Sequence, residues 1–234
     1  MAFYLSVQPY FQSYLLVVQG LSLTAAGHIV QIFNFTSSIT AVIVGLIVKL
    51  TGHYKYFVTL GSCVYLLGIG LMIKYRTQDT SIGALVGTQI AVGMGGGMAN
   101  GPALLGIQAS GNHQQVAAAT AVYLTMLEIG GAVGSAISGA VWSSSILHKL
   151  KQYLPDDTKS QASAIYGSIT TASSKYPEGT PARTAINRAY QETMHTLLVI
   201  AVCICIVPVV LSLLMKNYKL KQVRSPIYRH REMS

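Results

Sequence analysis

Glu128 is the only acidic residue inside any of the long apolar runs of this sequence, within the stretch TMLEIGGAVG. A charged side chain near the centre of a bilayer costs at least about 2.5 kcal/mol on insertion scales, so its presence there needs a reason. Burial raises the pKa of a carboxyl group, which favours the binding and release of protons near neutral pH. Glu128 is therefore a candidate for proton coupling. The alternative is a protonated glutamic acid that only hydrogen-bonds a neighbouring helix.

Amide and hydroxyl side chains also interrupt the apolar runs. Gln31, Asn34 and Ser38 follow one another at spacings of three and four, which places them on one face of a helix. That face should avoid lipid, so it either contacts another helix through hydrogen bonds or lines a path for substrate. The substrate-path candidates are Gln31, Asn34, Asn100 and Tyr123.

The stretch GMGGGMANGP, residues 93–102, contains five glycines. It does not match a phosphate-binding loop, because no lysine follows the glycines at the required position and GxGxxG cannot be fitted. Small residues at a spacing of four instead let transmembrane helices approach closely. Pro102 removes one backbone hydrogen bond, and such breaks line cavities in transporters, with a plain structural kink as the alternative. The helix-packing candidates are Gly93, Gly97, Gly101, Gly130 and Gly134.

Motifs for hydrolytic and zinc chemistry do not occur: HExxH, GxSxG and paired CxxC are all absent from the sequence. We therefore predict no enzymatic activity, no catalytic residue, no protein-bound metal and no cofactor. Hard cations need several oxygen ligands, and a single intramembrane carboxylate does not supply them. A metal ion that crosses here is expected to cross inside a chelator.

The composition indicates a membrane protein. Hydrophobic residues make up 51% of the 234 residues and charged residues only 10%, and the mean hydropathy is +0.47. The net charge of +9 would suggest nucleic acid in a soluble protein, but here the basic residues flank apolar runs and no aromatic-basic motif accompanies them. We expect a lipid bilayer, and not nucleic acid, as the surrounding partner.

Runs of roughly 20 apolar residues predict six membrane helices and an all-α fold. The first run is the weakest, because Pro9 interrupts it. Residues 1–146 hold five of the helices and the sixth precedes a basic tail, 216–234. The predicted spans are about 3–18, 26–48, 56–73, 81–108, 116–146 and 195–215.

Basic residues near the ends of the spans predict the orientation. Lys49, Lys55 and the tail 216–234 lie on one side, which the positive-inside rule makes cytoplasmic. The long segment 147–194 is then extracytosolic. Thr180 and Pro181 read as an N-cap and first helical position, so we expect this segment to be partly helical.

Tyrosines give the 147–194 segment an aromatic surface that a merely solvating linker would not need. Tyr166 and Tyr176 are candidates for contact with an external ligand. A folded capture surface is one interpretation of the segment, and an amphipathic helix that lies along the membrane is the other.

The connection GLIVKLTGHYK resembles the cytoplasmic loop signature of the major facilitator superfamily. Gly45, Lys49, Gly52 and Lys55 match it, and His53 stands where a basic residue is usual. Three longer stretches resemble the fungal siderophore iron transporters of that superfamily. They are YLLVVQGLSLTAAGHIVQIFNFTSSITAVIVGL, QIAVGMGGGMANGPALLG and TAVYLTMLEIGGAVGSAISGAVW.

The resemblance implies the six-helix C-terminal half of a larger transporter that imports ferric siderophores by proton symport. It implies no protein ligand for iron, because the whole chelate would enter. We expect a half-length or truncated member that works with an N-terminal half or a second copy, since alternating access needs two halves. The resemblance does not distinguish the plasma membrane from an endosomal vesicle membrane as the location. Two alternative functions are a glutathione/proton or drug/proton exchanger of the same fold and an inactive membrane remnant.

Overall fold

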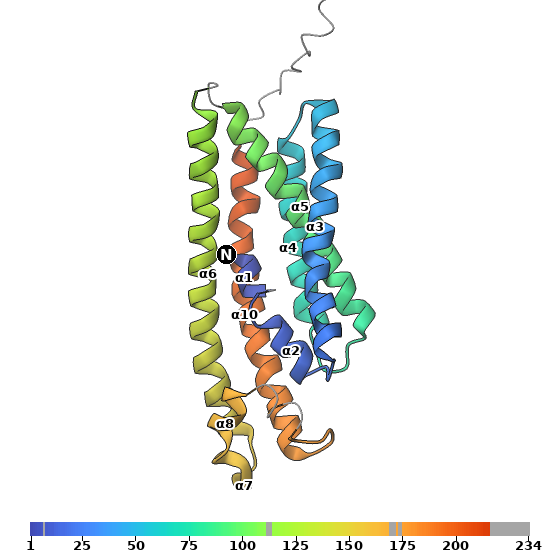
Figure 1. The fold of residues 1–234 in the computed structure, drawn as a ribbon, viewed down its shortest axis with the longest axis vertical. Coiled ribbons are helices and arrows are strands. Elements are labelled where there is room, and N and C mark those ends of the chain that lie inside the picture. Colours follow the sequence, from blue (N-terminus) through green and yellow to red (C-terminus); the bar gives the residue numbers. More distant parts are fainter. Residues whose placement is uncertain (7, 111–113, 169–171, 173–174, 216–234) are drawn as a thin grey trace, which may run out of the picture.

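The computed structural model describes residues 1–6, 8–110, 114–168, 172 and 175–215, and the predicted basic tail 216–234 lies outside them (Figure 1). Every element within these ranges is a helix, so the all-α fold class is confirmed. The helices are α1 (Ala2–Ser6), α2 (Phe11–Val17), α3 (Leu23–Thr51), α4 (Lys55–Tyr75), α5 (Ile82–Ser110), α6 (Val116–Tyr153), α7 (Asp156–Lys159), α8 (Ala162–Gly167) and α10 (Pro181–Leu214).

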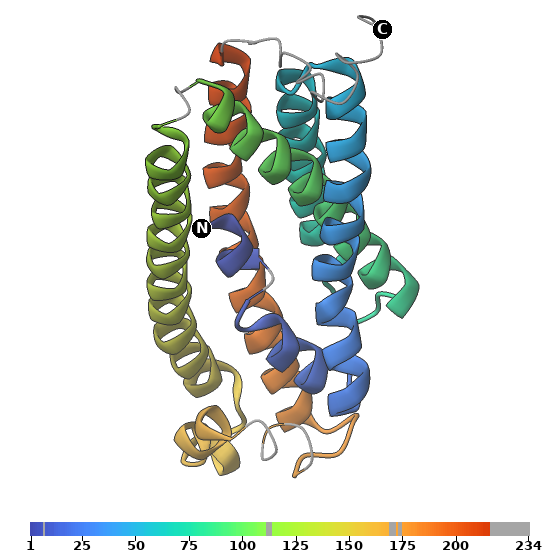
Figure 2. The ribbon, with the colours of Figure 1, turned by 45° about the horizontal axis from the view of Figure 1, so that its top comes forward.

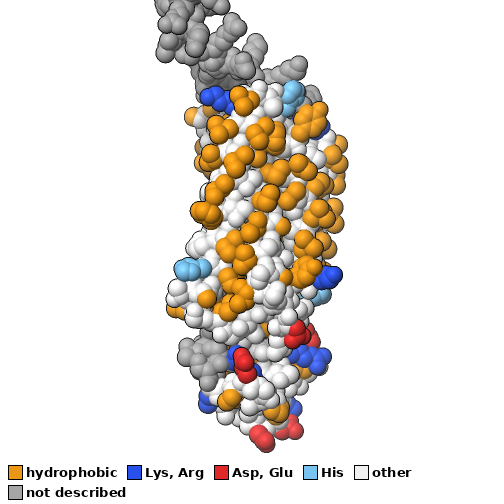
Figure 3. All heavy atoms as spheres, turned by 90° about the vertical axis from the view of Figure 1, so that its right-hand side faces the viewer, with side chains coloured by type: hydrophobic (Ala, Val, Ile, Leu, Met, Phe, Trp, Pro, Cys, Tyr) orange, Lys and Arg blue, Asp and Glu red, His pale blue; other side chains and the backbone are white. Residues whose placement is uncertain are grey.

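Five helices, α3, α4, α5, α6 and α10, are long and apolar enough to cross a membrane. With 38 and 34 residues, α6 and α10 are about 57 and 51 Å long, whereas the hydrocarbon core of a bilayer is about 30 Å thick. Both therefore extend beyond the bilayer at the end that carries α7 and α8, which we call the loop end. Figure 3 shows hydrophobic side chains over most of one face and acidic side chains gathered near that end.

The predicted first span, 3–18, is divided into two short helices, α1 and α2, and is not among the five long helices. Pro9 lies between them and interrupts the helix, because proline has no N–H to donate and its ring clashes with the preceding turn. Figures 1 and 2 place α1 near the middle of the bundle and α2 closer to the loop end.

Side chains and backbone turns set the limits of the long helices. The Ser22 side chain accepts a hydrogen bond from the Ala25 N–H, and α3 ends at Gly52, which has a φ of 70°. At the start of α10 the Thr180 side chain accepts from the Arg183 N–H at 3.3 Å, and Pro181 is the first helical residue. The N-cap predicted at Thr180 is thus confirmed.

Glycines bring α5 into close contact with α3, which runs parallel to it, and with α4. A Cβ atom at Gly93 would lie 2.8 Å from the Phe33 carbonyl oxygen of α3, and one at Gly61 would lie 2.7 Å from the Ala99 nitrogen. Gly97 likewise abuts Ser37 and Thr40 of α3. These contacts are too short for any larger side chain, so the close approach of the three helices depends on glycine.

The remaining predicted packing glycines differ among themselves. A Cβ at Gly134 of α6 would lie 2.8 Å from the Met1 carbonyl oxygen, so this glycine allows α1 to approach α6. At Gly130 the nearest atom is the Met1 nitrogen at 3.8 Å, and at Gly101 it is the Ala41 Cβ at 4.0 Å. Both distances are ordinary van der Waals contacts that alanine could share.

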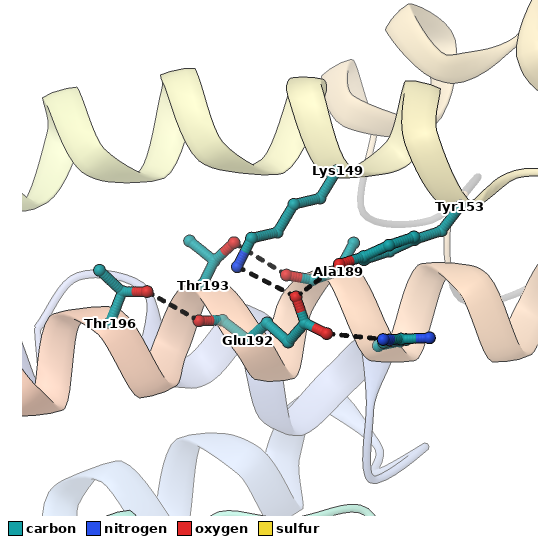
Figure 4. Close-up of polar contacts among 7 residues, drawn as sticks. Lys149, Tyr153, Ala189, Glu192, Thr193 and Thr196 are labelled. Carbon is teal, nitrogen blue, oxygen red and sulfur yellow. Dashed lines mark hydrogen bonds and ion pairs between the residues drawn. The ribbon is translucent and has the colours of Figure 1, made fainter.

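Outside the apolar sections, one carboxylate joins α6 to α10 (Figure 4). Glu192 of α10 accepts a hydrogen bond from the Tyr153 hydroxyl at 2.8 Å and lies 3.4 Å from the Lys149 ammonium, both on α6. The Arg188 Nε, one turn earlier on α10, donates to it at 2.9 Å. We call these four residues the Glu192 cluster. It fixes the distance between the two helices near the loop end.

Candidate functional site

A cavity of about 460 Å³ lies between α1, α3, α4, α5, α6 and α10, and we call it the inner pocket. Phe3, Tyr4 and Phe33 give it aromatic walls. Three of the predicted residues border it from three different helices: Asn34 from α3, Asn100 from α5 and Glu128 from α6. Residues that lie far apart in the sequence thus meet at one place in the bundle.

Glu128 makes no hydrogen bond or ion pair with the residues that the structure describes. It lies in the first half of α6, where most side chains are exposed. Its carboxyl group therefore faces a largely apolar pocket on one side and the open flank of the bundle on the other.

Asn34 and Asn100 each have a polar neighbour, Asn34 through its side-chain amide and Asn100 through its backbone carbonyl. The Asn34 Nδ2 donates to the Gln31 Oε1 at 2.9 Å, one turn earlier on α3. The Tyr123 hydroxyl of α6 donates to the Asn100 carbonyl oxygen at 3.4 Å. Gln31 and Tyr123 are therefore neighbours of pocket residues and do not line the pocket themselves.

Tyr166 and Tyr176 lie away from the inner pocket, near the loop end. Tyr166, on α8, packs half-buried against the hydrophobic core. The Tyr176 hydroxyl donates to the Gln161 Oε1 at 2.7 Å, and its ring is also half-buried. Contact of either tyrosine with an external ligand stays a prediction.

The predicted loop signature connects α3 to α4. Lys49 lies in the last turn of α3, and Gly52 ends that helix in the left-handed conformation, which glycine adopts without strain. The Lys55 Nζ donates to the Leu213 carbonyl oxygen at 2.8 Å, which joins this connection to the end of α10. A Cβ at Gly45 would meet nothing within 4 Å, so the packing in this chain does not require glycine there.

Several pocket residues were not found from the sequence. Ser62 and Tyr65 of α4 and Cys205 and Pro208 of α10 line the pocket. Ser62 and Tyr65 are three residues apart, and this polar spacing on an apolar helix was the one available signal. Cys205 reads as a small buried hydrophobe in the sequence, and it is only 3% exposed.

Comparison with known proteins gives strong matches in fungi. The chain is 55% identical over 223 residues to "Siderophore iron transporter mirC" of Emericella nidulans, an alignment that covers 95% of the chain and 37% of the relative. It is 52% identical to "MFS siderochrome iron transporter C" of Aspergillus fumigatus, with 95% of the chain and 36% of the relative covered. The chain is a homologue of the fungal MFS siderochrome iron transporters.

A more distant homologue is "Siderophore iron transporter 1" of Schizosaccharomyces pombe, 38% identical over 82% of the chain and 31% of the relative. The chain spans about a third of the length of the curated relatives it matches. No family model and no solved structure matches the chain. Together with the five candidate spans, the homologues indicate an integral, multi-pass membrane protein.

Proposed function

We propose that this chain forms one helical bundle of a proton-coupled transporter that imports ferric siderophores. The observation that carries the proposal is the convergence of Asn34, Asn100 and Glu128 on one pocket in a homologue of siderophore iron transporters. Each residue comes from a different helix, and polar side chains inside apolar helices are retained where they contact substrate or protons.

The pocket suits an organic chelate better than a bare ion. The rings of Phe3, Tyr4 and Phe33 offer apolar surface to the body of a chelate, and the amides of Asn34 and Asn100 can hydrogen-bond its polar groups. Among the described residues, no group of three or more His, Cys, Asp or Glu side chains is placed to hold a metal ion. The iron would therefore stay within its siderophore as cargo.

Proton coupling is assigned to Glu128. Glu128 would take up a proton while the pocket faces one side of the membrane and release it while the pocket faces the other side. This exchange requires the pocket to open alternately to the two sides of the membrane. Alternating access needs a second bundle, supplied by an N-terminal half or by a second copy of the chain. The plasma membrane or an endosomal vesicle membrane would be its location.

The test measures uptake of radiolabelled ferric siderophores by cells that lack their own siderophore transporters. The chain is expressed alone and with an N-terminal half from a homologue, with the proton gradient intact or collapsed. We expect gradient-dependent uptake, at least about tenfold lower in Glu128→Gln, which keeps the shape of the side chain but cannot ionise. Asp157→Asn is the matched control, because Asp157 is an exposed carboxylate on α7, away from the pocket.

If Glu128→Gln leaves uptake unchanged, Glu128 does not couple protons to transport. Efflux of glutathione or of a drug, with no siderophore uptake, would assign the fold to an exchanger. No flux of any cargo, despite confirmed membrane insertion and an added second bundle, would contradict transport altogether.

A further inference from the structure

Helix α2 separates the inner pocket from a second, polar pocket at the loop end. The second pocket measures about 350 Å³, and we call it the loop-side pocket. Its walls include Gln19, just after α2, together with Asp79, Glu178 and Asn187. On the other side of α2, residues Met1 to Tyr4 around α1 line the inner pocket. Figures 1 and 2 agree in placing α2 between α1 and the loop end.

The side chains of α2 fill the space between the two pockets. Phe11, Tyr14, Leu15 and Val17 are at most 1% exposed. The turn before α2 adds Tyr10, whose ring stacks on Trp142 of α6 with 4.3 Å between centroids. Trp142 in turn meets Tyr190 of α10 edge-on at 5.4 Å. An aromatic and aliphatic layer thus closes the inner pocket toward the loop end.

Two buried arginines from other helices hold the carbonyl ends of the two short helices. Arg183 of α10 donates from Nη2 to the Val17 carbonyl oxygen, the last of α2, at 2.6 Å, and from Nη1 to the Ala172 carbonyl oxygen at 2.7 Å. Arg76, directly after α4, donates to the Ser6 carbonyl oxygen, the last of α1. Both arginines are 3% exposed.

Each arginine also contacts the surroundings of α2. The Arg76 guanidinium lies over the Phe11 ring, 3.9 Å from its centroid. Arg183 forms part of the wall of the loop-side pocket. Hydrogen bonds from a guanidinium to helix-terminal carbonyls are charge-assisted and use the negative end of the helix. A buried arginine is costly unless such bonds form, so the Arg76 and Arg183 contacts favour the positions of α1 and α2 seen here.

We propose that α2 is a gate between the loop-side pocket and the inner pocket, and that Arg76 and Arg183 are positioning residues that hold it closed. The role of the inner pocket as a transport path rests on the proposed function, whereas the closure itself does not. When α2 moves away, the Val17 carbonyl leaves Arg183, the guanidinium becomes hydrated from the loop-side pocket, and the two pockets join.

Cys205 supplies a native reporter, because it lines the inner pocket and is one of only three cysteines. In a Cys63→Ala, Cys203→Ala background, a membrane-impermeant cationic thiol reagent is added to sealed vesicles from the loop side or from the opposite side. The measured quantity is the ratio of the two rates of Cys205 labelling. A reference variant in the same background, Gln78→Cys, measures access to the loop-side pocket, which Gln78 lines.

We expect slow labelling of Cys205 from the loop side in this background and fast labelling at Gln78→Cys. Arg183→Gln and Arg76→Gln should each raise the loop-side rate of Cys205 by at least about tenfold. Arg183→Gln removes the charge-assisted hydrogen bond to the last carbonyl of α2, and Arg76→Gln removes the guanidinium from the Phe11 ring of α2 and from the last carbonyl of α1. Arg188→Gln is the matched control, because Arg188 is on the same helix and exposed but contacts Glu192 and Tyr153 instead of α2. A merely structural role would raise labelling from both sides and leave the ratio unchanged.

Equal loop-side rates at Cys205 and Gln78→Cys would overturn the closure, and this comparison needs no arginine variant. An unchanged ratio of labelling rates in both arginine variants would overturn the role of Arg76 and Arg183 in holding α2 closed. If Arg183→Gln does not insert into the membrane, Arg183→Lys replaces it, because lysine keeps the charge but cannot donate to two carbonyl oxygens in the geometry of a guanidinium. A ratio of labelling rates equal to that of the parent would again overturn the role of Arg183 in holding α2 closed. Slow loop-side labelling of Cys205 that depends on Arg76 and Arg183, without siderophore uptake, would support the gate and refute only the proposed function.

Discussion

The Glu192 cluster should contribute measurably to stability through one contact in particular. The change is a double-mutant cycle of Glu192→Gln and Tyr153→Phe. Tyr153→Phe removes the hydroxyl 2.8 Å from Glu192 but keeps the ring over which the Arg188 guanidinium lies at 4.5 Å. A hydrogen bond to a charged group contributes about 1.5–3 kcal/mol. The Glu192 side chain is 36% exposed, so solvent screening reduces our expectation to a coupling energy of about 1 kcal/mol.

The other two partners of Glu192 should couple more weakly. Arg188 lies four residues before it on the same helix and is exposed, so solvent screens this ion pair. Lys149 is 3.4 Å away, and its ion pair joins two helices, so we expect about 0.2–1 kcal/mol. The cycle with Arg188→Gln is the control within one helix, because it does not connect α10 to α6.

Trp142 provides the assay, because it is the only tryptophan and lies between Tyr10 and Tyr190 where α6 meets α10. Its fluorescence is followed during denaturant unfolding in detergent micelles. A coupling energy below about 0.3 kcal/mol for Tyr153 and Glu192 would be within the error of additivity. It would refute the reasoning that this hydrogen bond fixes the spacing of the two helices.

Two further predictions concern packing. Gly93→Ala should lower the free energy of unfolding by about 1–3 kcal/mol, because its Cβ would lie 2.8 Å from the Phe33 carbonyl oxygen. Gly87→Ala on the same helix meets nothing within 4 Å and should be neutral or stabilising, and equal losses at both positions in thermal unfolding would contradict the close contact. Trp142→Ala should cost about 3–5 kcal/mol by removing a 6% exposed ring from between two tyrosines. Circular dichroism at 222 nm measures this loss, and a cost under about 1 kcal/mol would contradict the aromatic layer.

The long helices could be predicted because the bilayer imposes a length and an apolar composition on each span. The division of the first span could be predicted from Pro9, because proline interrupts a helix, although the sequence did not show where the two short helices would lie. Asn34, Asn100 and Glu128 were identifiable because a polar side chain in an apolar run is costly. The sequence alone could not place them at one pocket, since that depends on how the helices rotate and pack.

The residues that hold α1 and α2 could not have been found from sequence patterns. Arg183 and Val17 are 166 residues apart, and Arg76 and Ser6 are 70 apart. From the sequence alone, both arginines are expected in loops or at helix ends, where cations are usually solvated. Tyr65 and Pro208 escaped notice for a related reason, because an aromatic or apolar residue on an apolar helix looks the same whether it faces lipid, core or cavity.

The location of Glu128 links the gate to the need for a second bundle. Around it, Val122, Leu124, Met126 and Ile129 of α6 are each at least 50% exposed. Within the described bundle, α2 closes the inner pocket toward the loop end, whereas this flank of α6 is left open. The surface that covers the flank therefore determines whether Glu128 faces water, lipid or another helix. Proton binding at Glu128 and the position of α2 would then respond to the same movement of the second bundle, which would couple the proton to the cargo.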